Sequence, residues 1–118
     1  KVIVISSSTG GTLSLILGND PQIAALLLFG PNIEIYDPKS KLLTLPWGLQ
    51  IAEWVLGSKY HNMNNITDEK KNYWTIRYRL ESTVELQKLL ETAMRPEVFQ
   101  RITAPVFMGY YYKNTGNI

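Results

Sequence analysis

The first eighteen residues combine a short apolar run, a very tight turn and a helical pattern with nothing between them. The run Lys1–Ile5 is rich in β-branched residues, which favour strands. Ser6–Gly11 contains only serine, threonine and glycine, which favour turns. Apolar residues then recur at helical spacing in Thr12–Leu17, and Gly18 closes the pattern. The sequence therefore predicts a strand that reverses sharply into a helix, which restricts the chain to folds built from strand–helix units.

Ser8 lies at the centre of this turn, with a small residue two positions away on either side. These neighbours are Ser6 and Gly10, so the turn follows the pattern G-x-S-x-G with serine in place of the first glycine. Both must be small, because the reversal of the chain crowds them together while it exposes the central side chain. A helix starting near Thr9 points its free N–H groups toward that side chain. The pattern predicts Ser8 as a nucleophile and the Thr9 N–H as one donor of an oxyanion hole.

Two other interpretations of the same turn remain open. A turn rich in serine and glycine between a strand and a helix needs no chemistry at all. A helix N-terminus also binds an anion without further help. A phosphate-binding loop of the type G-x-x-x-x-G-K-[ST] is disfavoured, because no lysine follows Gly10 and Gly11.

Two further apolar runs predict two more strands. Ile23–Phe29 is continuously apolar and stops at Gly30-Pro31, as expected of a parallel strand buried on both faces. Val106–Tyr112 is the third strand candidate. Between these two runs we predict helices over residues 47–56, from 67 toward 80, over 81–94 and over 96–101.

We therefore predict an α/β fold, a three-stranded parallel sheet with helices and a helical cap, in a single domain. Residues 1–31 and 101–118 are predicted to form the sheet core. Residues 32–100 are predicted to form the helical cap, since an insertion of this length is typical of a functional lid.

Composition excludes several classes of function. The chain has no cysteine and one histidine, so we expect no disulfide, no metal site and no organic cofactor. Its net charge of +2 comes without a basic cluster, so no nucleic-acid partner is implied. No apolar run approaches the ~20 residues of a membrane span, and there is no signal peptide, so a cytoplasmic location is expected. Because the sequence starts inside a strand, we expect it to be a segment of a longer protein.

Three parts of the chain resemble the α/β-hydrolase superfamily, of the serine aminopeptidase, lysophospholipase and carboxylesterase-like type. They are Val2–Leu17, Ala25–Pro31 and Arg101–Gly109, with a helical cap between the last two. The resemblance implies that the three predicted strands are the fifth, sixth and seventh of a larger sheet. It also implies an acid after the third strand, but residues 113–118 contain neither Asp nor Glu.

The resemblance implies a serine hydrolase that cleaves an ester or amide of a fairly apolar small molecule through an acyl-enzyme. Only Ser8 and the Thr9 N–H carry over from the family's catalytic residues. The histidine and the acid are expected outside this sequence, in the complete parent protein. The chain alone is therefore predicted to be inactive.

Other residues have two interpretations each. Trp47, Trp54 and Tyr111 are candidates for lining an apolar substrate pocket, and packing within the cap or against helices is the alternative. His61 lies inside the predicted cap and is interpreted as a surface or packing residue instead of a base. Glu34 and Asp37 are interpreted as residues of a solvated loop or as anchors of the cap.

Two alternatives to a hydrolase belong to different classes. The first is a non-catalytic α/β module that binds an anion or an apolar ligand at Ser6–Gly11. The second is an inert proteolytic fragment that pairs with a copy of itself. In that case Lys1–Ser6 would be an exposed apolar edge strand, and such edges recruit partners.

Overall fold

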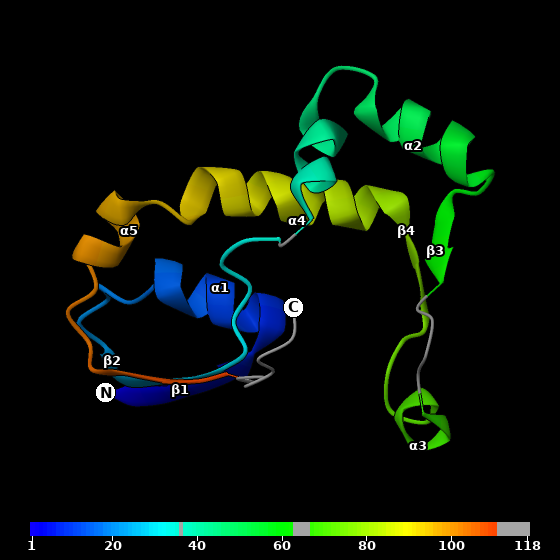
Figure 1. Ribbon diagram of the computed structural model, residues 1–118. Helices are drawn as coiled ribbons and strands as arrows, with labels where there is room; N and C mark the ends of the chain where they lie inside the picture. The colour runs from blue at the N-terminus through cyan, green and yellow to red at the C-terminus, as the bar shows by residue number, and fades with distance from the viewer. Residues whose placement is uncertain (36, 63–66, 111–118) are drawn as a thin grey trace, which may run out of the picture. The chain divides into compact units, whose positions relative to one another are not determined.

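In a computed structural model of the protein, the chain is described over residues 1–35, 37–62 and 67–110 (Figure 1). It divides into two compact units. The sheet unit contains Lys1–Glu34 and the chain from Leu90 onward, and the insertion unit contains Ile35–Leu89. The sequence predicts boundaries between residues 31 and 32 and between residues 100 and 101. In the structure, residues 32–34 and 90–100 group with the sheet unit instead of the insertion unit.

The sheet unit is built on three parallel strands. They are β1 (Val2–Ser7), β2 (Ile23–Phe29) and β5 (Val106–Gly109), in the order β1-β2-β5. Helix α1 (Ser8–Ile16) connects β1 to β2 and lies along the sheet (Figure 1). The predicted α/β class with a three-stranded parallel sheet is confirmed. Strand β5 ends at Gly109, and the last two residues of the predicted strand lie outside the described residues.

The core lies between one face of the sheet and α1. Leu26 and Leu28 of β2 are completely buried against Leu15 of α1. Side chains from both ends of the sheet unit pack around them: Val4, Ile23, Met94, Phe99, Ile102 and Ala104. Because Met94 and Phe99 belong to this core, the segment from Leu90 to Gln100 groups with the sheet and not with the insertion.

The opposite face of the sheet is apolar and largely exposed. Strand side chains alternate between faces, so the paired positions Ile5, Leu27 and Phe107 lie opposite the core. Ile5 and Phe107 are 68% and 59% exposed, and Leu27 is half-buried. Parallel sheets normally have both faces covered, and in the described part of this unit only one face is.

The insertion unit is mainly helical. It contains a 3-10 helix η1 (Pro38–Thr44), α2 (Gly48–Leu56), the short α3 (Asp68–Lys71) and most of α4 (Leu80–Ala93). Helix α4 continues into the sheet unit, where α5 (Pro96–Gln100) follows it. The predicted helices over 47–56, 81–94 and 96–101 are confirmed within one or two residues. Gly57 ends α2 at a φ of 62°, a left-handed conformation that glycine adopts easily.

The predicted helix from residue 67 toward residue 80 is wrong beyond its first turn. After α3 the chain forms β4 (Arg77–Arg79), which pairs antiparallel with β3 (Tyr60–Asn62). Cross-strand side-chain contacts explain the preference. The guanidinium of Arg77 lies 4.1 Å from the centre of the Tyr60 ring, and the ring centres of His61 and Tyr78 are 5.3 Å apart.

Candidate functional site

The turn between β1 and α1 contains no connecting residue. Ser7 is the last residue of the strand, with extended dihedral angles of −137° and 160°, and Ser8 is the first residue of the helix. Ser8 has a φ of 51°. For a residue with a side chain this left-handed conformation costs about 1–2 kcal/mol. The reversal predicted from the sequence is therefore present, and the strained residue is the one predicted as nucleophile.

The two small neighbours of Ser8 face each other. A Cβ added to Gly10 would lie 3.6 Å from the Cβ of Ser6, which is ordinary van der Waals contact. A side chain larger than a methyl group at Gly10 would therefore compete with Ser6 for the same space. Ser6 and Gly10 are thus neighbours, as the motif predicts, and a single methyl group at Gly10 would still fit.

Ser6 has a structural hydrogen bond. Ser14 Oγ lies 2.8 Å from the Gly10 carbonyl oxygen, which only accepts, so the single proton of Ser14 is donated there. Ser6 Oγ lies 2.8 Å from Ser14 Oγ, and Ser6 must therefore donate to Ser14. This chain of two bonds ties the end of β1 to the second turn of α1.

The Ser8 side chain is half-buried and contacts a residue that the sequence did not single out. Asn32 Nδ2 lies 3.2 Å from Ser8 Oγ and 3.1 Å from Thr9 Oγ1, and it donates to both. Asn32 follows β2 as Ser8 follows β1. Because the carboxyl ends of parallel strands meet at the same edge of a sheet, this topology is the signal that could have found Asn32.

The N-terminus of α1 has neither a capping side chain nor an acidic residue of its own to balance the helix dipole. The positive end of the helix dipole is therefore not neutralised by its own residues. The Thr9 N–H belongs to this first turn, as an oxyanion donor must.

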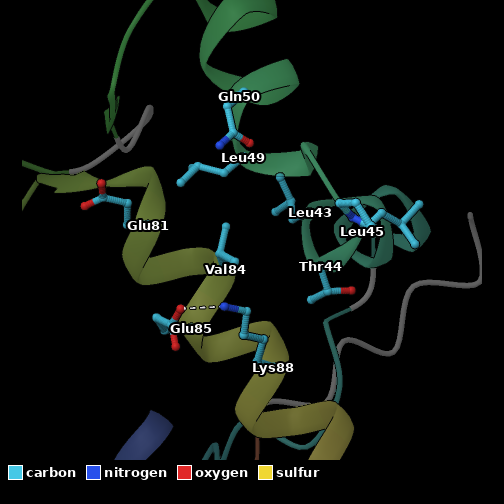
Figure 2. Close-up of a pocket in the computed structure, with 10 residues that line it drawn as sticks. Leu43, Thr44, Leu45, Leu49, Gln50, Glu81, Val84, Glu85 and Lys88 are labelled. Carbon is cyan, nitrogen blue, oxygen red and sulfur yellow. Dashed lines mark hydrogen bonds and ion pairs between the residues drawn. The ribbon is translucent and has the colours of Figure 1, made fainter.

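Two of the three residues predicted to line a substrate pocket, Trp47 and Trp54, belong to the insertion unit. Trp47 and Trp54 are 73% and 83% exposed in the insertion unit, and Tyr111 lies outside the described residues. The insertion unit contains an open cavity of about 360 Å³ that neither tryptophan lines. Figure 2 shows Leu43, Leu49 and Val84 around this space, with the ion pair between Glu85 and Lys88 at 2.8 Å beside it.

The candidate bases and acids are also in the insertion or next to it. His61 lies in β3 against Tyr78. Asp37 caps η1 by accepting from the Lys39 N–H at 2.9 Å. Glu34 is the last residue before the insertion unit. The sheet unit contains no histidine, so Ser8 has no imidazole within its own unit.

The fold and the turn together define an α/β protein with a strained serine between a parallel strand and the helix that follows it. Comparisons of the chain with protein-family models, with curated proteins and with solved structures found no match. No helix in the described ranges combines the length and apolar character needed to cross a membrane. The same residues contain no group of three or more His, Cys, Asp or Glu side chains placed to hold a metal ion.

Proposed function

We propose that this chain carries the nucleophile of a serine hydrolase of the α/β-hydrolase superfamily, acting on an ester or amide of a small apolar molecule. One observation supports this above all others: Ser8 has a φ of 51° where β1 passes directly into α1. Strained backbone of this kind is concentrated at functional sites, where the surrounding structure holds it. A hydroxyl displayed on such a turn, at the start of a helix, is the arrangement that nucleophilic serine requires.

In the proposed reaction the Ser8 Oγ bonds to the carbonyl carbon of the substrate and gives its proton to a general base. The carbonyl oxygen becomes negative and accepts a hydrogen bond from the Thr9 N–H. The bond to the leaving alcohol or amine then breaks, and the leaving group takes the proton from the base. Water hydrolyses the resulting ester of Ser8. Since the sheet unit has no histidine, the base is proposed to come from outside that unit, in the complete protein.

A non-catalytic site for an anion at Ser6–Gly11 is the rival proposal. Backbone N–H groups and the helix dipole would bind an anion equally well if Ser8 had an unstrained conformation. The hydrolase therefore explains why Ser8 keeps a conformation that costs about 1–2 kcal/mol, and the anion site does not. The hydrogen bond that Asn32 donates to Ser8 Oγ also supports the hydrolase, because it leaves the hydroxyl proton of Ser8 available for a base.

The proposal is tested by treating the complete protein with a fluorophosphonate and locating the adduct by peptide mass spectrometry. We expect the label on Ser8 and its loss in Ser8→Ala. The matched control is Ser82→Ala, since Ser82 is an exposed serine of α4 and its variant should be labelled like the unmodified protein. A protein that stays unlabelled, or that is labelled equally in Ser8→Ala, would show that Ser8 is not a nucleophile.

A further inference from the structure

Asn32 is held in a loop that contacts both the sheet and the helix. The loop begins at Gly30, whose φ is 53° and whose N–H donates to the Gly109 carbonyl at 2.7 Å. Pro31 then packs on Gly11 so closely that a Cβ there would lie 2.6 Å from the Cβ of Pro31. The loop is thus fixed between β5 and α1 immediately before it reaches Asn32.

The backbone of Asn32 is bonded on both sides. Its N–H donates to the Ser8 carbonyl at 3.2 Å, and its own carbonyl accepts from the hydroxyl of the buried Thr12. These two bonds fix the position of the Asn32 Cα relative to the turn without any help from the side chain. The side-chain amide is therefore not needed to attach the loop, yet it is directed at the reacting hydroxyl.

The side-chain amide of Asn32 uses its two protons on two neighbouring hydroxyl groups, those of Ser8 and Thr9. An asparagine nitrogen only donates, so Ser8 Oγ is the acceptor of its bond. The single proton of Ser8 then remains available for a base. Thr9 Oγ1, at 3.1 Å, holds the amide in the orientation that makes this contact.

On the basis of the proposed function, we propose that Asn32 is a catalytic residue whose side-chain N–H holds the nucleophile before attack and donates to the oxyanion after it. When Ser8 Oγ bonds to the carbonyl carbon, Oγ becomes a weaker acceptor while the carbonyl oxygen gains a full negative charge. Both oxygens are then attached to the same carbon. A donor that reaches one is within a small shift of the other.

This step leaves the proton balance unchanged. The proton of Ser8 goes to the base, the electron pair of the carbonyl double bond goes to its oxygen, and Asn32 keeps both of its protons. The Thr9 N–H and the Asn32 N–H would then be two donors to one oxyanion. Side-chain amides serve as oxyanion donors in other hydrolases, and removing one lowers kcat about 10²–10³-fold.

The test compares Asn32→Asp and Asn32→Ala with the complete unmodified protein. Asp has the shape of Asn, but its ionised carboxylate only accepts hydrogen bonds, so this variant keeps the packing and can no longer donate to Ser8 or to the oxyanion. The control is Asn19→Ala, which truncates an exposed asparagine in the turn after α1. For each protein three properties are measured. They are kcat and KM on a p-nitrophenyl ester, the inhibition constant of a trifluoromethyl ketone, and the thermal midpoint. The ketone forms a tetrahedral adduct with a reactive serine.

We expect kcat to fall about 10²–10³-fold in both Asn32 variants, with KM nearly unchanged. The inhibition constant of the ketone should rise by a similar factor, and the thermal midpoint of Asn32→Asp should stay close to that of the unmodified protein. If either variant keeps its kcat, or if kcat falls while the ketone binds as before, Asn32 is not an oxyanion donor. An unmodified protein that no fluorophosphonate labels would instead overturn the proposed function itself.

Discussion

Gly11 of α1 and Pro31 of the loop after β2 are in direct contact. Gly11 is buried, and a Cβ built on it would lie 2.6 Å from the Cβ and 3.0 Å from the Cα of Pro31. The Cα is backbone and its neighbour Asn32 is bonded to Ser8 and Thr12, so the loop has little room to withdraw. The absence of a side chain at Gly11 therefore allows the loop to reach the turn.

Gly11→Ala is expected to lower the free energy of unfolding by about 1–3 kcal/mol, as overpacking of a buried site usually does. The neighbouring Gly10→Ala is the matched control. Its Cβ would be in ordinary contact with Ser6, and alanine favours a helix over glycine by about 1 kcal/mol, so this variant should be neutral or stabilising. Urea denaturation followed by circular dichroism compares the two. Equal stabilities would show that the loop does not pack on Gly11 as described.

Ser14 is expected to be needed for the connection between β1 and α1. It is only 5% exposed, donates to the Gly10 carbonyl and accepts from Ser6. Ser14→Ala leaves the hydroxyl of Ser6 without this acceptor, which should cost about 1–3 kcal/mol of the free energy of unfolding.

A double-mutant cycle with Ser6→Ala isolates the Ser6–Ser14 bond. The double variant Ser6→Ala/Ser14→Ala removes both partners, so its loss of stability should be smaller than the sum of the two single losses. The measurement is urea denaturation of the four proteins. Strict additivity of the two single losses would mean that the hydroxyl groups of Ser6 and Ser14 do not interact.

Local sequence signals predicted the parts of the fold that local interactions determine. The continuous apolar run Ile23–Phe29 became the buried central strand, and Gly57 ended α2 in the left-handed conformation that glycine favours. The strained turn was predictable for the same reason, since small residues around Ser8 are a local requirement of the reversal.

What the sequence missed depends on contacts between distant residues. The strands β3 and β4 have three residues each, and their pairing rests on contacts such as that between Tyr60 and Arg77, for which neither segment alone gives a signal. Asn32 lies 24 positions from Ser8, and only the sheet topology brings the two together. Periodicity placed Trp54 on a helix but gave no information on its 83% exposure.

Ile5 is expected to contribute to self-association of the 118-residue chain when this chain is produced by itself. It is 68% exposed on β1, which is an edge strand of the sheet, and it lies on the apolar face opposite the core. Ile5→Lys should lower the average mass measured by light scattering at high protein concentration, because a charged side chain on an edge strand opposes pairing. The control is Leu13→Lys, since Leu13 is an exposed apolar residue of α1. A monomer at every concentration for the unmodified chain would contradict this prediction.

The left-handed backbone conformation of Ser8 is expected to lower the free energy of unfolding of the protein. A residue with a side chain at a φ of 51° is strained by about 1–2 kcal/mol, whereas glycine adopts this conformation freely. Ser8→Gly should therefore be more stable than Ser8→Ala by about 1 kcal/mol, although both variants lose the hydroxyl and its bond to Asn32. Chemical denaturation of the two variants measures the difference, and fluorophosphonate labelling should be absent from both. If Ser8→Ala is the more stable of the two, the turn does not strain Ser8, and the main support for the proposed nucleophile is lost.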